Sequence, residues 1–142
     1  MTREALSRLA GEHRRLDELF GRFLSAAHAG APAEARAAIQ AFDESLRAHT
    51  AAEESLFPPR ARKLLPVAGE TDSERTFREL ALEHVQLREL SAIILRGLAS
   101  GDDLLPARSL APALARRWDA HTAREEAEWG GRPDGAAPDE MP

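Results

Sequence analysis

Apolar residues recur along this chain at alternating three- and four-residue steps, and glycine or proline interrupts the pattern at a few places. Steps of this kind place apolar side chains on one face of an α-helix, so the pattern predicts amphipathic helices that pack against one another. We predict four helical segments, at about residues 2–28, 32–58, 71–100 and 103–130. A connector over about residues 60–72 joins the second segment to the third.

The predicted ends of these segments rest on residues that begin or stop helices. Pro32 opens the second segment, where a missing backbone N–H costs nothing, and the prolines at 58–59 close it. Thr71 and Glu74 have the spacing of a capping box at the start of the third segment. Pro112 lies inside the fourth segment, which predicts either a later start for that helix or a kink.

The four segments predict an all-α fold, an antiparallel up-down-up-down four-helix bundle, because short connections make successive helices antiparallel neighbours. Alanine, arginine, leucine and glutamate dominate the composition and favour helix. Residues with β-branched side chains are few and tyrosine is absent, which disfavours sheet. We expect one domain over residues 1–131 and a disordered tail over 132–142, which is rich in proline, glycine and aspartate.

Six ionisable residues lie on the apolar stripes of the predicted helices. They are His13, His49, Glu53, His84, His121 and Glu125. In the second and fourth segments a histidine precedes a glutamate by four residues, so both side chains lie on one helix face. A rise of ~1.5 Å per residue, counted from the turns, places all six at nearly the same level of an antiparallel bundle. The sequence therefore predicts four imidazoles and two carboxylates in one slab of the core.

The two halves of the chain resemble each other around these residues. Residues 12–19, EHRRLDEL, match residues 83–90, EHVQLREL. Residues 48–54, AHTAAEE, match residues 120–126, AHTAREE. We therefore expect the bundle to be an internal two-fold repeat of one helical hairpin.

Two ionised glutamates inside a core are costly, at about several kcal/mol each, unless something compensates their charge. Bound cations would compensate it directly. Nitrogen and oxygen ligands without sulfur suit iron, manganese or zinc, and the chain contains no cysteine. Six protein ligands exceed the four of a tetrahedral zinc site, whereas two metal ions bridged by both glutamates use all six. The pattern thus predicts a two-metal centre.

A single histidine in a protein core is usually structural, but four of them at matched levels in duplicate favour a metal centre. His28 has no counterpart in the repeat and is expected at the surface end of its helix. Glu12 and Glu83 directly precede two of the histidines and point about 100° away from them on a helix. Glu54 and Glu126 are expected outside the ligand set. The alternative of a helical scaffold without metal leaves both core glutamates uncompensated.

The segment from His49 to Pro58, HTAAEESLFP, resembles the His-x-x-x-Glu-Glu signature of the hemerythrin-like, or HHE, domain family. The resemblance covers nearly the whole chain, from about Leu6 to Trp129. It implies a four-helix bundle with a non-haem di-iron centre that binds dioxygen or a related small ligand. In that family's arrangement the two irons (Fe2+ or Fe3+) are bridged by carboxylates and by an oxo or hydroxo group.

Carried over position by position, the resemblance implies a ligand set for each iron. One iron would be held by His13 and His49, the other by His84 and His121, with Glu53 and Glu125 bridging them.

One position departs from the oxygen-carrying members of the family, which have a second histidine one turn after the histidine of the third helix. Arg88 stands there in this chain and cannot ligate a metal. Its counterpart in the repeat, Asp17, could, although an Asp17–Arg88 ion pair or simple exposure is the expectation. Whether Asp17, Glu12 or Glu83 adds a ligand in its place stays open at this point.

The number of protein ligands on each iron determines whether a position is left open for a small molecule. Two histidines, two bridging carboxylates and a solvent bridge leave one octahedral position open on each iron. We therefore expect a protein that binds dioxygen, nitric oxide or peroxide, with a role in oxygen or redox sensing or in stress defence. The alternative is a di-iron enzyme with catalase- or peroxidase-like or oxygenase activity, and a third reading is an iron store or iron sensor.

Charge and hydropathy exclude other classes of function. The net charge is −5 with both signs mixed along the chain, unlike a nucleic-acid-binding surface. No apolar run approaches the ~18 residues of a membrane span, and the first residues lack the apolar core of a signal peptide. The absence of cysteine is compatible with a cytoplasmic location. The sequence identifies no protein partner.

Overall fold

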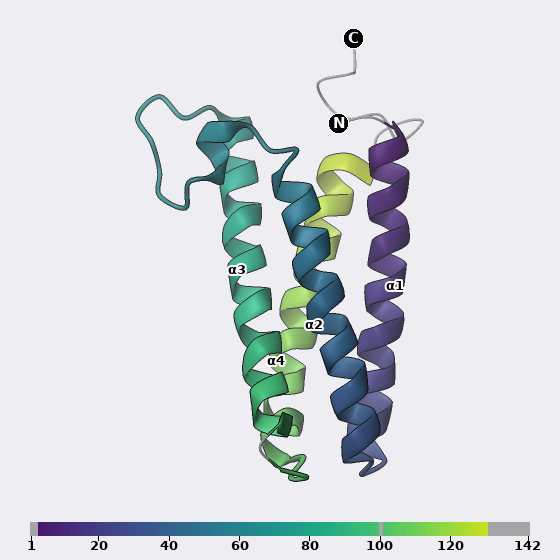
Figure 1. Cartoon of the computed structure of the whole chain (residues 1–142). Coiled ribbons are helices and arrows are strands. Elements are labelled where there is room, and N and C mark those ends of the chain that lie inside the picture. The colour runs from purple at the N-terminus through teal and green to yellow at the C-terminus, as the bar shows by residue number, and fades with distance from the viewer. Residues whose placement is uncertain (1–2, 100, 131–142) are drawn as a thin grey trace.

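The computed structural model describes residues 3–99 and 101–130, which form four α-helices and no strand (Figure 1). The helices are α1 (Arg3–His28), α2 (Pro32–Glu54), α3 (Asp72–Ala99) and α4 (Leu105–Glu125). Two shorter elements are the 3-10 helix η1 (Pro59–Arg62) and the π-helical segment η2 (Glu126–Gly130), which continues α4. The all-α prediction is confirmed.

The four helices lie side by side in an antiparallel up-down-up-down bundle (Figure 1). α1 packs along α2 and α3 along α4, so the two predicted hairpins are formed, and further contacts join α2 to α3 and α1 to α4. The α1–α2 and α3–α4 turns lie at one end of the bundle, and the longer α2–α3 connection lies at the other. Each helix therefore crosses the middle of the bundle, where all four can contribute to one site.

Most helix ends agree with the local signals in the sequence, but α2 ends at Glu54, before the prolines at 58–59 that were predicted to close it. The Thr71 amide donates to the Glu74 carboxylate and the Glu74 amide donates to the Thr71 hydroxyl, both at 3.0 Å, so the predicted capping box is formed. Gly30 adopts a φ of 74° in the α1–α2 turn, a left-handed conformation that glycine adopts without steric cost. α4 begins at Leu105 and contains Pro112, so a start of this helix after Pro112 is wrong.

Thr71→Ala is expected to lower the free energy of unfolding by about 1 kcal/mol, because the variant loses the side-chain acceptor for the Glu74 amide. Urea denaturation followed by circular dichroism measures this loss. Thr76→Ala is the matched control, since its hydroxyl bonds only to the Asp72 carbonyl inside the helix, and it is expected to cost about 0.5 kcal/mol or less. Equal losses in the two variants would show that the cap contributes nothing specific.

Two clusters of buried apolar side chains fill the bundle at different levels. The larger cluster includes Leu16, Phe23, Phe42, Leu46, Leu87, Leu114 and Trp118. The smaller cluster consists of Leu9, Phe57, Leu80 and Ala81, with Phe77 packed against it.

α1 and α3 contribute side chains to both clusters, and the predicted site residue of each helix lies between the two clusters. On α1, His13 lies between Leu9 and Leu16, and on α3, His84 lies between Ala81 and Leu87. The site is therefore a polar layer with apolar side chains above and below it, which keeps water away from its ionisable groups.

No helix within the described ranges carries an apolar stretch long enough to cross a membrane. The predicted tail at 132–142 lies outside the described residues, as do the side chains of Leu6 and Trp129. The assignment of residues 1–131 to one domain stays a prediction.

Candidate metal centre

Each of the four helices contributes one histidine to the polar layer, and α2 and α4 each add a glutamate one turn later. Five of the six residues are at most 2 % exposed: His49, Glu53, His84, His121 and Glu125. The side chain of His13 is 12 % exposed. The structure thus brings together all six residues that the sequence singled out.

The donor atoms of these residues form two overlapping groups. One group contains His13 and His49, the other contains His84 and His121, and both glutamates belong to each group. Within a group, one nitrogen or oxygen atom from every residue lies within 4.8 Å of the others. The arrangement can therefore hold two cations that share both carboxylates.

Each glutamate lies between histidines of different groups. Oε1 of Glu53 is 2.9 Å from Nε2 of His84, and Oε2 of Glu53 is 3.4 Å from Nε2 of His49. The nearest Glu125 oxygen is 2.9 Å from Nε2 of His13 and 3.1 Å from Nε2 of His121. A carboxylate in this position could therefore contact a cation in either group.

Despite these short distances, the inward-facing atoms lack hydrogen-bond partners with acceptable geometry. The unpartnered buried atoms are Nε2 of His13, His49, His84 and His121 and both carboxylate oxygens of Glu53 and Glu125. Nearly all buried polar atoms in native proteins are hydrogen-bonded, and each exception costs about 1–3 kcal/mol. Eight such atoms in one layer would be a large penalty unless another group satisfies them.

A metal pair fits this donor set. At ligand distances of ~2.1 Å and octahedral angles, neighbouring ligand atoms are about 3.0 Å apart. The closest nitrogen–oxygen distances, 2.9–3.1 Å, agree with that spacing. Cations bound between these atoms would accept the lone pairs of all eight, so the residues present could hold a metal pair.

The outer nitrogens of three histidines are held by glutamates from neighbouring helices. The Nδ1–H groups of His49, His84 and His121 donate to Glu12 at 2.7 Å, Glu54 at 2.8 Å and Glu83 at 2.8 Å, respectively. Because a carboxylate only accepts, each bond places the proton on Nδ1 and leaves the Nε2 lone pair facing the layer.

Charges in the layer shift its pKa values strongly. Burial alone would lower the pKa of His84, but the carboxylates of Glu125, Glu53 and Glu54 outweigh burial and raise it to about 11. Burial would raise the pKa of Glu125, but the surrounding imidazoles, His121 foremost, hold it well below its ordinary value. Without a cation, His84 would therefore be protonated beside a charged Glu125, and a metal ion could take the place of the inward proton of His84.

Glu12 and Glu83 have a role that the sequence reasoning missed. Helical phase correctly turned each away from the histidine that follows it, but each reaches the histidine of the partner helix in its hairpin. The Glu-His dipeptide that recurs in both halves of the chain was the available signal. Neither glutamate is among the groups that could hold a metal, because each carboxylate lies behind an imidazole.

Arg88, which stands where oxygen carriers have a further histidine, and its repeat counterpart Asp17 both have hydrogen-bond partners outside the donor groups. Arg88 donates to the Thr50 hydroxyl at 2.8 Å and to Glu54 at 3.1 Å. Asp17 accepts a hydrogen bond of 2.6 Å from the indole nitrogen of Trp118. Of the two expectations for Asp17, the ion pair with Arg88 is wrong, whereas its exposure is confirmed. Asp17 is not part of either donor group.

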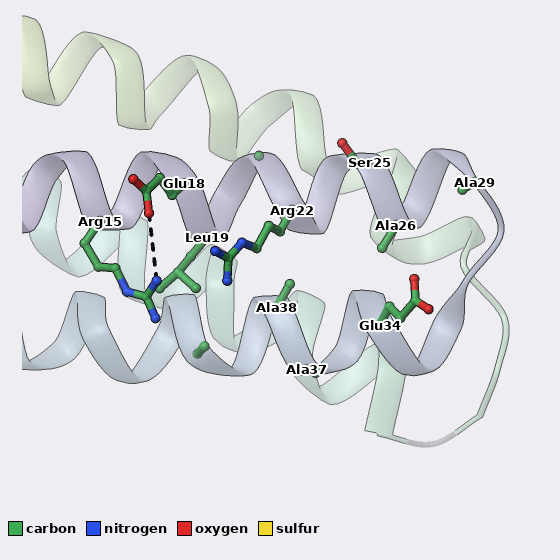
Figure 2. A pocket seen from close by; sticks show the side chains of 12 residues that line it. Arg15, Glu18, Leu19, Arg22, Ser25, Ala26, Ala29, Glu34, Ala37 and Ala38 are labelled. Carbon is green, nitrogen blue, oxygen red and sulfur yellow. Dashed lines mark ion pairs between the residues drawn. The ribbon is translucent and has the colours of Figure 1, made fainter.

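A separate hollow lies on the surface between α1 and α2, in the half of the bundle near their connecting turn (Figure 2). Its volume is about 960 Å³, and alanines and Leu19 form much of its wall. Arg15 and Glu18 at its edge form an ion pair with a nitrogen–oxygen distance of 3.9 Å. None of the six predicted ligands lines this groove, so it is distinct from the centre.

Comparison with known proteins agrees with this geometry. The family model of the hemerythrin HHE cation binding domain matches residues 4–132. Comparisons with curated proteins and with solved structures give no match.

Proposed function

Because the chain belongs to the hemerythrin HHE cation-binding domain family, we propose that its metal-binding layer holds two iron ions and binds dioxygen or a related small ligand. Nitric oxide and peroxide are the other ligands in this proposal. The role we propose is in oxygen or redox sensing or in defence against oxidative stress. A cytoplasmic location stays a prediction.

The observation that carries the proposal is the set of eight unpartnered nitrogen and oxygen atoms that face one another inside the core. A single cation would leave part of this set unsatisfied, since the donor atoms divide into two groups that share only the glutamates. The absence of sulfur ligands favours a metal that accepts imidazole and carboxylate together, and iron is among these.

In this proposal His13 and His49 would hold one iron, His84 and His121 the other, and Glu53 and Glu125 would bridge them, together with an oxo or hydroxo group. Bound iron would supply reversible redox chemistry and an open position for a small ligand. The protein contributes imidazoles fixed with Nε2 inward, a pair of charge-balancing carboxylates, and apolar clusters on both sides that exclude water.

A second candidate is catalase- or peroxidase-like turnover of peroxide. The observation that favours it is the equal division of the histidines, two in each donor group, with Arg88 bound to Thr50 and Glu54 where a further histidine would stand. Two equally ligated irons would each keep an open position, whereas a reversible carrier needs only one. An oxygenase reaction would also need a binding site for an organic substrate, and none of the described residues identifies one.

Purified protein reconstituted anaerobically with ferrous iron is expected to retain about two irons per chain. After oxidation we expect the near-ultraviolet absorption of an oxo-bridged ferric pair, measured together with iron content. Sustained release of oxygen from added peroxide would favour the enzyme, and formation of a reversible oxygen adduct would favour the binding protein. Absence of bound metal after reconstitution would contradict the proposed function altogether.

A further inference from the structure

The two-fold repeat offers four places where a glutamate outside the ligand set could bond to the outer nitrogen of a histidine, and three of these bonds are formed. Glu12 on α1 bonds to His49 on α2, and the equivalent residue Glu83 on α3 bonds to His121 on α4. Glu54, which follows the glutamate of the second helix, bonds to His84 on α3. The repeat therefore predicts a fourth pair, between the counterpart of Glu54 and the histidine of α1.

That fourth pair is not formed. The counterpart of Glu54 is Glu126, which is exposed at the start of η2, where the α-helix gives way to a π-helix. Among the described residues no carboxylate is hydrogen-bonded to Nδ1 of His13. His13 instead has the indole of Trp118 edge-on at 5.6 Å between ring centroids, and it is the most exposed of the four histidines.

Two of the three glutamates are themselves held by arginines. Arg88 donates to Glu54 at 3.1 Å, and Arg124 donates to Glu83 at 2.6 Å. Both of these glutamates serve the histidines of one donor group, His84 and His121. The other group has a single supported histidine, His49, because its second member is His13.

A carboxylate on the outer nitrogen fixes the tautomer and orientation of a ligating imidazole and increases its basicity. Loss of such a partner typically lowers metal affinity by about 10- to 100-fold. An imidazole without one must be oriented again each time a metal binds.

We propose that Glu12, Glu54 and Glu83 are positioning residues for the metal ligands and that the two metal positions are unequal. The ion between His84 and His121 is held firmly, and the ion between His13 and His49 exchanges readily. This inference rests on the proposed function only in requiring that the layer binds a metal pair.

The test is metal release from the full chain loaded with Co2+, whose absorption reports its ligands. Excess chelator is expected to remove the metal in two phases of equal size. His13→Ala should abolish the fast phase and keep the slow one, which assigns the phases to the two positions. Iron content after ferrous loading provides a second measurement of the same stoichiometry.

Glutamine variants separate a positioning role from a general structural one. Glu83→Gln and Glu54→Gln are expected to accelerate the slow phase by about 10- to 100-fold, and Glu12→Gln is expected to accelerate the fast phase. Glu126→Gln, which changes the exposed counterpart of Glu54, should alter neither rate. Circular dichroism and thermal unfolding of each apo variant show whether the bundle is intact, and three separate positions are available if one variant does not fold.

Several outcomes would overturn the inference without affecting the proposed function. Release of both ions in one phase would show that the positions are equal. Release rates of the Glu12, Glu54 and Glu83 variants equal to that of Glu126→Gln would show that the carboxylates do not position the ligands. Failure of the unmodified chain to bind any metal is a different result, since it contradicts the proposed function itself.

Discussion

Glu125→Ala is expected to abolish binding of the metal pair. The Glu125 carboxylate is 1 % exposed, belongs to both donor groups and lies within 3.1 Å of imidazole nitrogens from α1 and α4. Its removal takes one ligand from each proposed metal position and the single negative charge that the two positions share. We expect metal content to fall from about two ions per chain to less than one, measured by elemental analysis after ferrous reconstitution.

Glu126→Ala is the matched control for this variant. It removes a glutamate from the adjacent residue, but one that is exposed and outside both donor groups, so the metal content should stay at the unmodified level. Circular dichroism of the Glu125 variant establishes that the bundle is still formed. A folded Glu125→Ala protein that retains both ions would contradict the proposal that Glu125 is a bridging ligand.

The location of the centre could be predicted because helical periodicity sets the direction of each side chain. His13 and His84 lie in the apolar stripes of their helices, and the His-x-x-x-Glu spacing places His49 beside Glu53 on one helix face. The α1–α2 turn sets the level at which α1 and α2 meet, so these residues come together in the structure. Their role as metal ligands stays a prediction that the metal measurements address.

The contacts of the outer residues could not be predicted in the same way. Whether Glu12 reaches His49 depends on the rotation and separation of two different helices, and the sequence of one helix determines neither. Arg88 illustrates the same limit, since its counterpart in the repeat, Asp17, was one expected partner, whereas the packing of α2 on α3 places Arg88 beside Glu54. The change from α- to π-helix at Glu126 had no signal in the apolar pattern.

The six residues of the polar layer are arranged with two-fold symmetry, because the repeat places the same residue types on equivalent helices. The residues behind them follow the repeat only where helix packing permits it, and the departure occurs at His13 and Glu126. A duplicated hairpin can therefore give two metal positions with the same ligand types and different exchange behaviour.

Removal of the metal is expected to lower the unfolding temperature of the chain by an amount on the order of 15 °C. Free metal at about 1,000 times its dissociation constant stabilises the folded state by about 4 kcal/mol, and for a chain of this length each kcal/mol corresponds to roughly 4 °C. The physical reason is that the apo protein keeps the Nε2 atoms of four imidazoles and the oxygens of two carboxylates buried in one layer without cations. Thermal unfolding followed by circular dichroism, with and without chelator, measures the shift, and Glu125→Ala should show none. A shift of equal size in that variant would mean that chelation acts elsewhere in the protein.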